Sequence, residues 1–386
     1  MTTPDWFSHT ATAPASACRR VNQHLAAYTR TVGDHARTHL GEDTSICLSG
    51  SLARGEPAVR RGRTGYTLGS DVDLVAVVDH LENAEPAVEK FTRALLETHP
   101  DIDTTVFTVH RADLGSVAGR FGADLHHAAD RPLAGPTPAG VAEPRIGRRE
   151  GLEGLTHQLA TIYCPDSPPA ATPWRVKTAL EALRAVATVS GLAGGPQRYS
   201  DLVDNPLVCT ALRPGVVAEL VRARERSTRM PITDAIAYDL VITAACYLFD
   251  VASTHDDLLA ALHSIPDGVH LLDGFQRAVL AATIIGYGPT RFRCAAGSAL
   301  HVTLTAIEDA TVPAGLSSLE ALRRISPVEF GRGIDHPNRV LRQHLQGLRR
   351  DYYQHLSAHN FGAQPATTYT GPTTATGPTP RRPAHG

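Results

Sequence analysis

The sequence predicts an α+β protein in which a mixed β-sheet with flanking helices is followed by an all-helical second domain. Between residues 44 and 109, short runs rich in β-branched residues alternate with a helical segment. From residue 151 onward, apolar residues recur at helical intervals between Gly, Pro and Asp breaks. The segment 131–150 is rich in Pro and Gly and has no clear period, so we expect the domain boundary there.

The first domain is expected to begin with an amphipathic helix, because apolar residues from about Cys18 to Leu40 fall on one helical stripe. A helix is also expected at "EPAVEKFTRALLETH" (85–99). Strands are expected at "TSICLSG" (44–50), "DVDLVAVV" (71–78) and "DIDTTVFTV" (101–109). These elements together predict a small α/β unit with a mixed sheet.

Composition divides the whole chain into five parts. We expect a flexible N-terminus (1–17), a catalytic domain (18–130), a linker (131–150), a helical domain that binds substrate and nucleotide (151–360) and a disordered tail (361–386) rich in Thr, Pro and Gly. Helices of the second domain are expected within 174–191, 207–226, 232–253, 271–286 and 336–356.

Bulk properties limit the class of partner. A formal net charge of -2 disfavours a protein whose whole surface binds nucleic acid. The N-terminus has no basic start followed by an apolar run, and no apolar segment is long enough to span a bilayer, so we expect a cytoplasmic protein without a membrane partner. The 6 cysteines lack metal-type spacing. The pairs His35/His39 and His126/His127 are interpreted as solvated faces.

The pair Asp71 and Asp73 is the main candidate for chemistry. Residues i and i+2 of a strand point to the same face, so both carboxylates project together while Val72 faces the other way. Adjacent carboxylates repel each other unless a cation lies between them, and oxygen ligands suit Mg²⁺ or Mn²⁺. Asp103, near the start of the next strand, is expected to complete the site, with Asp101 as the alternative.

The turn before this strand suggests a phosphate site. Gly50 and Ser51 follow a short strand and lead into a helix, where exposed backbone N–H groups favour anions. A phosphate cradle beside paired carboxylates is typical of a nucleoside triphosphate site.

These motifs carry a resemblance to a known family. "GSLARGE", "SDVDLVAVV" and the later "IDTTVF" resemble the nucleotidyltransferase superfamily that shares the polymerase-beta catalytic fold. The segment Arg175–Leu202 is similar to the helical second domain of small-molecule members, such as those that adenylylate aminoglycosides. The gap between Gly55 and Ser70 is longer than in compact members of the family.

The resemblance implies transfer of a nucleoside monophosphate from a triphosphate, expected to be ATP, to a hydroxyl of a small molecule with release of pyrophosphate. It assigns catalysis and metal binding to Asp71, Asp73 and Asp103. The nucleotide is expected at Gly50, Ser51, Arg54, Ser70, Lys177, Tyr199 and Ser200.

Some of the residues predicted to bind nucleotide, and the insertion 56–69, have a second interpretation. Lys177 is one of 2 lysines in an arginine-rich chain, so it is either a point charge for phosphate or a surface residue. Tyr199 and Ser200 either stack on and hydrogen-bond a base or serve as core and cap. The insertion 56–69 either roofs the pocket or carries a solvated hairpin tip at "RRGR" (60–63).

Two other functions compete with small-molecule transfer. One is a non-catalytic or regulatory nucleotide-binding protein, which retention of all three acids disfavours. The other is an enzyme that extends nucleic-acid ends, which the bulk charge and the lack of an aromatic and basic stripe disfavour.

Overall fold

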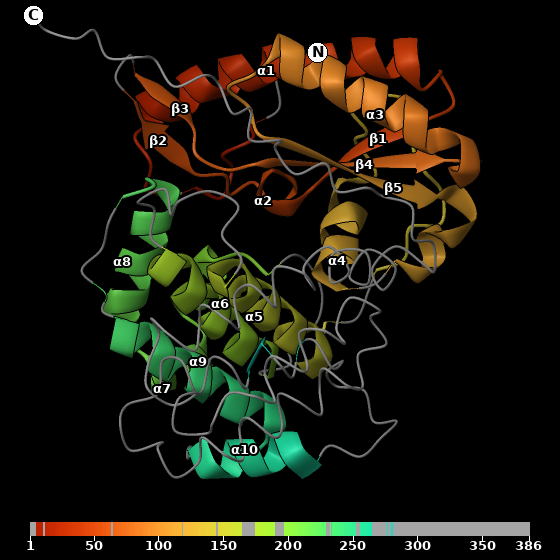
Figure 1. Cartoon of the computed structure of the whole chain (residues 1–386). Coiled ribbons are helices and arrows are strands. Elements are labelled where there is room, and N and C mark those ends of the chain that lie inside the picture. Colours follow the sequence, from red (N-terminus) through yellow and green to blue (C-terminus); the bar gives the residue numbers. More distant parts are fainter. Residues whose placement is uncertain are drawn as a thin grey trace, which may run out of the picture.

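The computed structural model describes most of the first 280 residues of the 386-residue chain, and Figure 1 shows their arrangement. The described residues are 5–10, 12–62, 65–117, 119–143, 146–163, 174–189, 197–228, 232, 234–251, 255–264, 276, 279 and 280. They form a mixed α+β structure, as the sequence predicts.

A three-stranded mixed sheet has the order β1-β4-β5. Strand β4 (Val72–Val78) lies in the middle, antiparallel to β1 (Ser45–Ser49) and parallel to β5 (Thr104–His110). Its Val and Leu side chains are buried, because both faces of the sheet are packed against other parts of the protein. The parallel pair is joined through helix α3 (Leu81–Thr98), and the three predicted strands are confirmed within a few residues.

Helices cover both faces of the sheet, as Figure 1 shows. Helix α1 (Ala15–His39) packs with α3 on one face, and its buried residues recur every three to four positions. A hydrogen bond of 2.9 Å joins Tyr28 Oη of α1 to Thr104 Oγ1 of β5. The 3-10 helix η1 (Arg111–Ser116) and helix α4 (Gly119–Ala128) follow β5, and α4 packs below β1.

The insertion 56–69 forms a hairpin of β2 (Val59–Arg61) and β3 (Tyr66–Leu68) that contacts α1. Val59 and Leu68 are buried in the same core as α1. The hairpin therefore extends the first core, while Arg60 and Arg61 at its tip are exposed. Arg63 lies outside the described residues.

The start of the segment predicted as a linker belongs to the sheet. The Leu133 N–H donates to Ile46 O at 2.7 Å, and the Ile46 N–H donates to Ala134 O at 2.9 Å. Residues 133 and 134 thus run along the free edge of β1, whose backbone groups need partners. Composition alone did not predict this pairing, because Pro and Gly content says nothing about a neighbouring strand edge.

The predicted flexible N-terminus is wrong for residues 5–10, which pack against the protein. Trp6 and Phe7 are buried in the core of α1 and the sheet. The His9 N–H donates to Gly55 O at 2.9 Å. Thr12 binds the carboxylate of Glu225 through its N–H and its hydroxyl.

The helical region has α6 at its centre. Helix α6 (Trp174–Val189) contacts α5 (Arg148–Tyr163), α7 (Pro206–Ala211), α8 (Pro214–Glu225) and α9 (Asp234–Phe249), while α10 (His255–Ser264) packs against α9. The short 3-10 helix η2 (Ser200–Leu202) lies between α6 and α8. The apolar side chains of these elements form one core. This helical layer lies beneath the sheet in Figure 1.

The sequence predicted the helices α6 to α9 but not α4, α5 or α10. Pro214 divides the predicted helix 207–226 into α7 and α8, because proline starts a helix readily and cannot continue one. The predicted helix at 336–356, most of that at 271–286, and the tail 361–386 lie outside the described residues. Among the described helices, none has a long enough apolar stretch to cross a bilayer.

Candidate active site

Asp71 and Asp73 lie at the start of the central strand, where alternation places both carboxylates on one side. Val72 between them is fully buried on the opposite face. The register sets Asp73 between Ser49 of β1 and Thr105 of β5. The side of the strand opposite Val72 therefore holds both acids at the sheet rim, as the sequence predicts.

Gly50 is the residue that lets the β1–α2 turn pass over Asp73. Helix α2 (Gly50–Ala53) begins directly after β1, and Gly50 has a φ of 63°. A Cβ atom at this position would lie 2.2 Å from Asp73 Oδ2. Both the backbone conformation and the close approach thus require glycine. The next residue, Ser51, has a buried hydroxyl without a hydrogen-bond partner among the described residues.

Burial and the neighbouring carboxylate of Asp71 both act on the pKa of Asp73. Burial, and then the charge of Asp71, raise the pKa of Asp73 well above its ordinary value, while Lys177 and Arg54 oppose this shift. Neither Asp71 nor Asp73 forms an ion pair with any residue that the structure describes. The arrangement favours a cation between the carboxylates, because a positive charge would relieve their repulsion.

Asp103 lies beside Asp71, whereas Asp101 lies elsewhere. The Val72 N–H donates to Asp103 O at 2.8 Å, so the parallel register carries Asp103 next to Asp71. Burial and the charge of Asp71 raise the pKa of Asp103. Asp101 instead contacts His24, with 3.0 Å between its Oδ2 and the imidazole Nε2. Of the two alternatives for a third acid, the geometry favours Asp103.

A cavity of about 250 Å³ opens between the sheet rim and the helical layer. Its lining combines the two aspartates and the Gly-Ser turn with residues of β5, α4, α5, α6 and α8. The described lining residues are Gly50, Ser51, Arg54, Asp71, Asp73, Thr105, Phe107, Arg120, Phe121, Asp124, Glu150, Glu153, Gly154, His157, Gln158, Lys177, Glu181, Arg184, Tyr199 and Arg224.

Helix α6 contributes one polar face to the cavity. Lys177, Glu181 and Arg184 are four and three residues apart, so they lie along the same side of the helix. Lys177 is an exposed residue, while Glu181 and Arg184 are buried. Lys177 lines the cavity and is exposed, so this placement is compatible with both alternatives that the sequence left open.

Glu181 is held by cations on two sides. Its carboxylate accepts from Arg120 Nη1 at 2.7 Å, Arg184 Nη1 at 3.2 Å and Tyr199 Oη at 2.5 Å. Burial alone would raise its pKa, but Arg184 and Arg120 together with the tyrosine hydroxyl lower the pKa of Glu181 to about 2. The Glu181 carboxylate is therefore ionised, and the guanidinium groups of Arg120 and Arg184 balance its charge.

A second group of matched charges joins the sheet to the helices. Arg54 contacts Glu56 at 2.7 Å and Asp124 at 2.5 Å. Glu56 also contacts Arg184 Nη2 at 3.3 Å and accepts from the Tyr199 N–H at 2.7 Å. Burial raises the pKa of Asp124 to about 6 although Arg54 opposes the shift. We call Arg54, Glu56, Asp124, Arg120, Glu181, Arg184 and Tyr199 the buried ion network.

Some guanidinium N–H groups of this network have no acceptor. Nε and Nη2 of Arg120 and Nε of Arg184 are buried without a hydrogen-bond partner among the described residues. The Arg120 side chain lies against Gly154, where a Cβ would be 2.6 Å from its Nη1. Buried donors without acceptors are costly, so these groups favour an anion in the cavity.

The other residues predicted to bind nucleotide lie partly in the cavity and partly elsewhere. Gly50, Ser51 and Arg54 line the cavity, although Arg54 is engaged by two carboxylates. Tyr199 is buried with the guanidinium of Arg184 3.8 Å from its ring centroid, so it serves the network rather than a free stacking surface. Its predicted core role is therefore the one its contacts support.

Ser70, Ser200 and Asp103 are not among the residues that line the described cavity, although Asp103 lies beside Asp71. The hydroxyl of Ser70 accepts from the Ala58 N–H at 2.8 Å and closes the base of the hairpin. Ser200 Oγ lies 3.5 Å from Asp201 Oδ1. No described residue of the insertion 56–69 lines the cavity either, because the hairpin turns toward α1.

Sequence reasoning missed most of the basic and aromatic lining. Thr105 and Phe107 could have been found by strand alternation from Asp103, and Glu181 and Arg184 by helical spacing from Lys177. Arg120, Phe121, Asp124 and Arg224 carried no such signal, because α4 was not predicted and the end of α8 had no link to the site.

Comparisons with protein-family models, with curated proteins and with solved structures gave no match. The geometry of the cavity is therefore the main guide to the function of this protein.

Proposed function

We propose that this protein is a metal-dependent nucleotidyltransferase with a polymerase-beta-like catalytic domain, which moves a nucleoside monophosphate from ATP to a hydroxyl of a small molecule. The observation that carries the proposal is the contact of Gly50 with Asp73. It sets a glycine turn against paired carboxylates, in a cavity that also contains guanidinium donors without acceptors.

The donor set fits a divalent cation. Asp71 and Asp73 present carboxylate oxygens from one strand face, and burial together with the charge of Asp71 raises the pKa of Asp73. Hard cations such as Mg²⁺ or Mn²⁺ prefer oxygen ligands of this type. When bound there, the ion would neutralise phosphate charge and lower the pKa of the attacking hydroxyl.

The phosphates would be bound by donors from both layers. Ser51 offers an unpartnered hydroxyl at the turn, and Arg120 offers unpartnered N–H groups from α4. Lys177 adds an exposed ammonium from α6, close enough to Asp73 to act on its pKa. Charged donors that converge from several elements favour a polyanion such as a triphosphate over a single carboxylate.

The reaction needs one bond to form and one to break. The acceptor hydroxyl oxygen attacks the α-phosphorus, the bond from that phosphorus to the bridging oxygen breaks, and pyrophosphate leaves. Asp103 accepts the hydroxyl proton, and its raised pKa suits it to this role. The cavity volume of about 250 Å³ suits a compact acceptor rather than an extended polymer.

The test is incubation of the purified protein with each nucleoside triphosphate, Mg²⁺ and pooled small metabolites. Pyrophosphate release and mass spectrometry should show an acceptor that has gained one nucleoside monophosphate. Triphosphate binding without pyrophosphate would favour the regulatory alternative. Label that appears only on RNA or DNA would favour an end-extending enzyme.

A further inference from the structure

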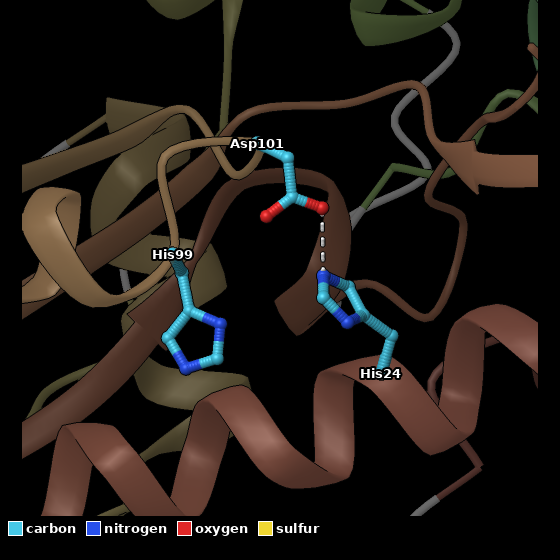
Figure 2. A group of neighbouring side chains, drawn as sticks. All are labelled: His24, His99 and Asp101. Carbon is cyan, nitrogen blue, oxygen red and sulfur yellow. Dashed lines mark ion pairs between the residues drawn. The ribbon is translucent and has the colours of Figure 1, made fainter.

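A second group of metal-ligating side chains lies outside the cavity, between α1 and the turn that precedes β5. It consists of His24, His99 and Asp101, and Figure 2 shows the three side chains turned toward one another. One ligand atom from each residue lies within 4.8 Å of those of the other two. None of these residues lines the described cavity, and none has a role in the proposed transfer reaction.

His24 and Asp101 lie at a separation that suits two ligands of one ion. Nε2 of His24 is 3.0 Å from Asp101 Oδ2, which is an ion pair when the imidazole is protonated. When the imidazole is neutral and Nε2 carries no proton, the nitrogen and the carboxylate oxygen each offer a lone pair to a cation. In a tetrahedral zinc site, neighbouring ligand atoms are about 3.3 Å apart, given bond lengths of about 2.0–2.2 Å.

His99 is oriented by a neighbour in a way that suits metal binding. Its Nε2 is 3.0 Å from Thr31 Oγ1, so Nδ1 is the nitrogen left for an ion. The ring of Tyr28 packs edge-on against His99, with 5.4 Å between centroids. A hydrogen bond to the second ring nitrogen fixes the orientation of a ligating imidazole.

The geometry points to a site for Zn²⁺, held by His24, His99 and Asp101 with a fourth position open to solvent. Two imidazoles and one carboxylate favour Zn²⁺ over Mg²⁺, which prefers oxygen ligands alone. The side chains of His24 and Asp101 are 39% and 55% exposed, so the cluster lies at the protein surface.

Such an ion would link two parts of the first domain. His24 lies on α1, whereas His99 and Asp101 belong to the turn between α3 and β5. That turn leads directly to Asp103 and Thr105 at the sheet rim. The ion would therefore fix the start of β5 relative to α1, and its role is structural support of the strand.

The test measures zinc binding by the full-length protein through competition with a chromogenic chelator, with Co²⁺ absorption as a second probe. We expect one tight site and a rise in Tm on addition of Zn²⁺. His24→Gln, His99→Gln and Asp101→Asn should each weaken that site at least about tenfold. His35→Gln, on the same helix but outside the cluster, is the matched control and should bind as the wild type does.

Asp73→Asn should also retain the zinc site, which separates this site from the carboxylate pair at the cavity. Unchanged affinity in all three ligand variants, or no stoichiometric zinc binding by the wild-type protein, would overturn the proposal. Circular dichroism of each variant shows that it is folded. If His99→Gln is unfolded, the exposed His24→Gln and Asp101→Asn variants decide the question.

Discussion

Acidic residues on the two sides of the cavity differ in whether a described cation forms an ion pair with them. On the sheet side, Asp71 and Asp73 share one strand face, and neither forms an ion pair with a described residue. On the helical side, Glu181 is matched by Arg120 and Arg184 within 3.2 Å. The pKa shifts follow this difference, since that of Asp73 is raised and that of Glu181 is lowered to about 2.

The difference separates residues that hold the protein together from residues available to a ligand. Matched buried charges such as Glu56 and Arg184 join segments that are 128 positions apart in the chain. Unmatched carboxylates at a cavity cost free energy in the folded state unless something positive joins them. The following predictions test this contrast, from the largest expected effect to the smallest.

Asp73→Asn should abolish nucleotidyl transfer, lowering kcat by at least about 10²–10³-fold. The amide keeps the shape of the side chain but removes a charged ligand for the divalent cation. Pyrophosphate release at saturating triphosphate measures the effect. Asp79→Asn, just beyond the other end of β4, is the matched control and should keep wild-type turnover. A rate near wild type in Asp73→Asn would remove this residue from the site.

Glu56→Gln should lower the free energy of unfolding by about 3 kcal/mol, because it leaves buried guanidinium groups without their counter-charge. Glu56 is 2% exposed and contacts both Arg54 and Arg184. Urea unfolding gives the measurement. Glu89→Gln removes an exposed ion pair with Arg93 and should change stability by less than about 0.5 kcal/mol. Equal effects of the two substitutions would contradict a structural role for the buried ion network.

Gly50→Ala should destabilise the protein and also disturb the carboxylate pair. The new Cβ would lie 2.2 Å from Asp73 Oδ2, and the residue would keep a positive φ. Gly41→Ala is the matched control, since Gly41 has a φ of 88° but open space around its Cβ position.

Gly41→Ala should therefore cost only about 1–2 kcal/mol of backbone strain and leave turnover intact. Gly50→Ala should lose more stability than this and lose turnover as well. If Gly50→Ala and Gly41→Ala lose the same stability and keep the same turnover, the close approach of Gly50 to Asp73 affects neither property.

Lys177→Ala should weaken triphosphate binding about tenfold and monophosphate binding much less, because we propose that its ammonium contacts the outer phosphates. Lys90→Ala removes the chain's other lysine, which is exposed on α3, and should leave both affinities unchanged. Calorimetric titration with both nucleotides gives the comparison. Equal weakening of the two nucleotides would assign Lys177 a surface role.

The stability of the protein without divalent cations should fall as pH rises above the ordinary pKa of an aspartate, 3.8. The pKa of Asp73 is raised on folding, so the folded state binds its proton more tightly than the unfolded state does. This contribution is fully present below the unfolded pKa and is lost as pH rises through the raised folded pKa. Urea unfolding between pH 4 and 8 should show a flatter profile for Asp73→Asn, and identical profiles would contradict the shift.

The sequence by itself determined the features that depend on local backbone geometry. Strand alternation was sufficient to place Asp71 and Asp73 on one face, because a period of two is a property of the extended chain. The Gly-Ser turn and the exposure of Lys177 on a helix face were likewise predictable. Helical spacing from Lys177 would also have predicted that Glu181 and Arg184 lie at the site.

Tertiary structure determined which charged side chains form ion pairs. Arg54 was predicted to contact nucleotide, but Glu56 and Asp124 engage it, the latter 70 residues away. Asp101 and Asp103 are alike in sequence, yet the packing of α1 against the α3–β5 turn brings His24 to Asp101 and leaves Asp103 beside Asp71. Local periodicity fixes the direction of a side chain along its own element, whereas its partner depends on how distant elements pack.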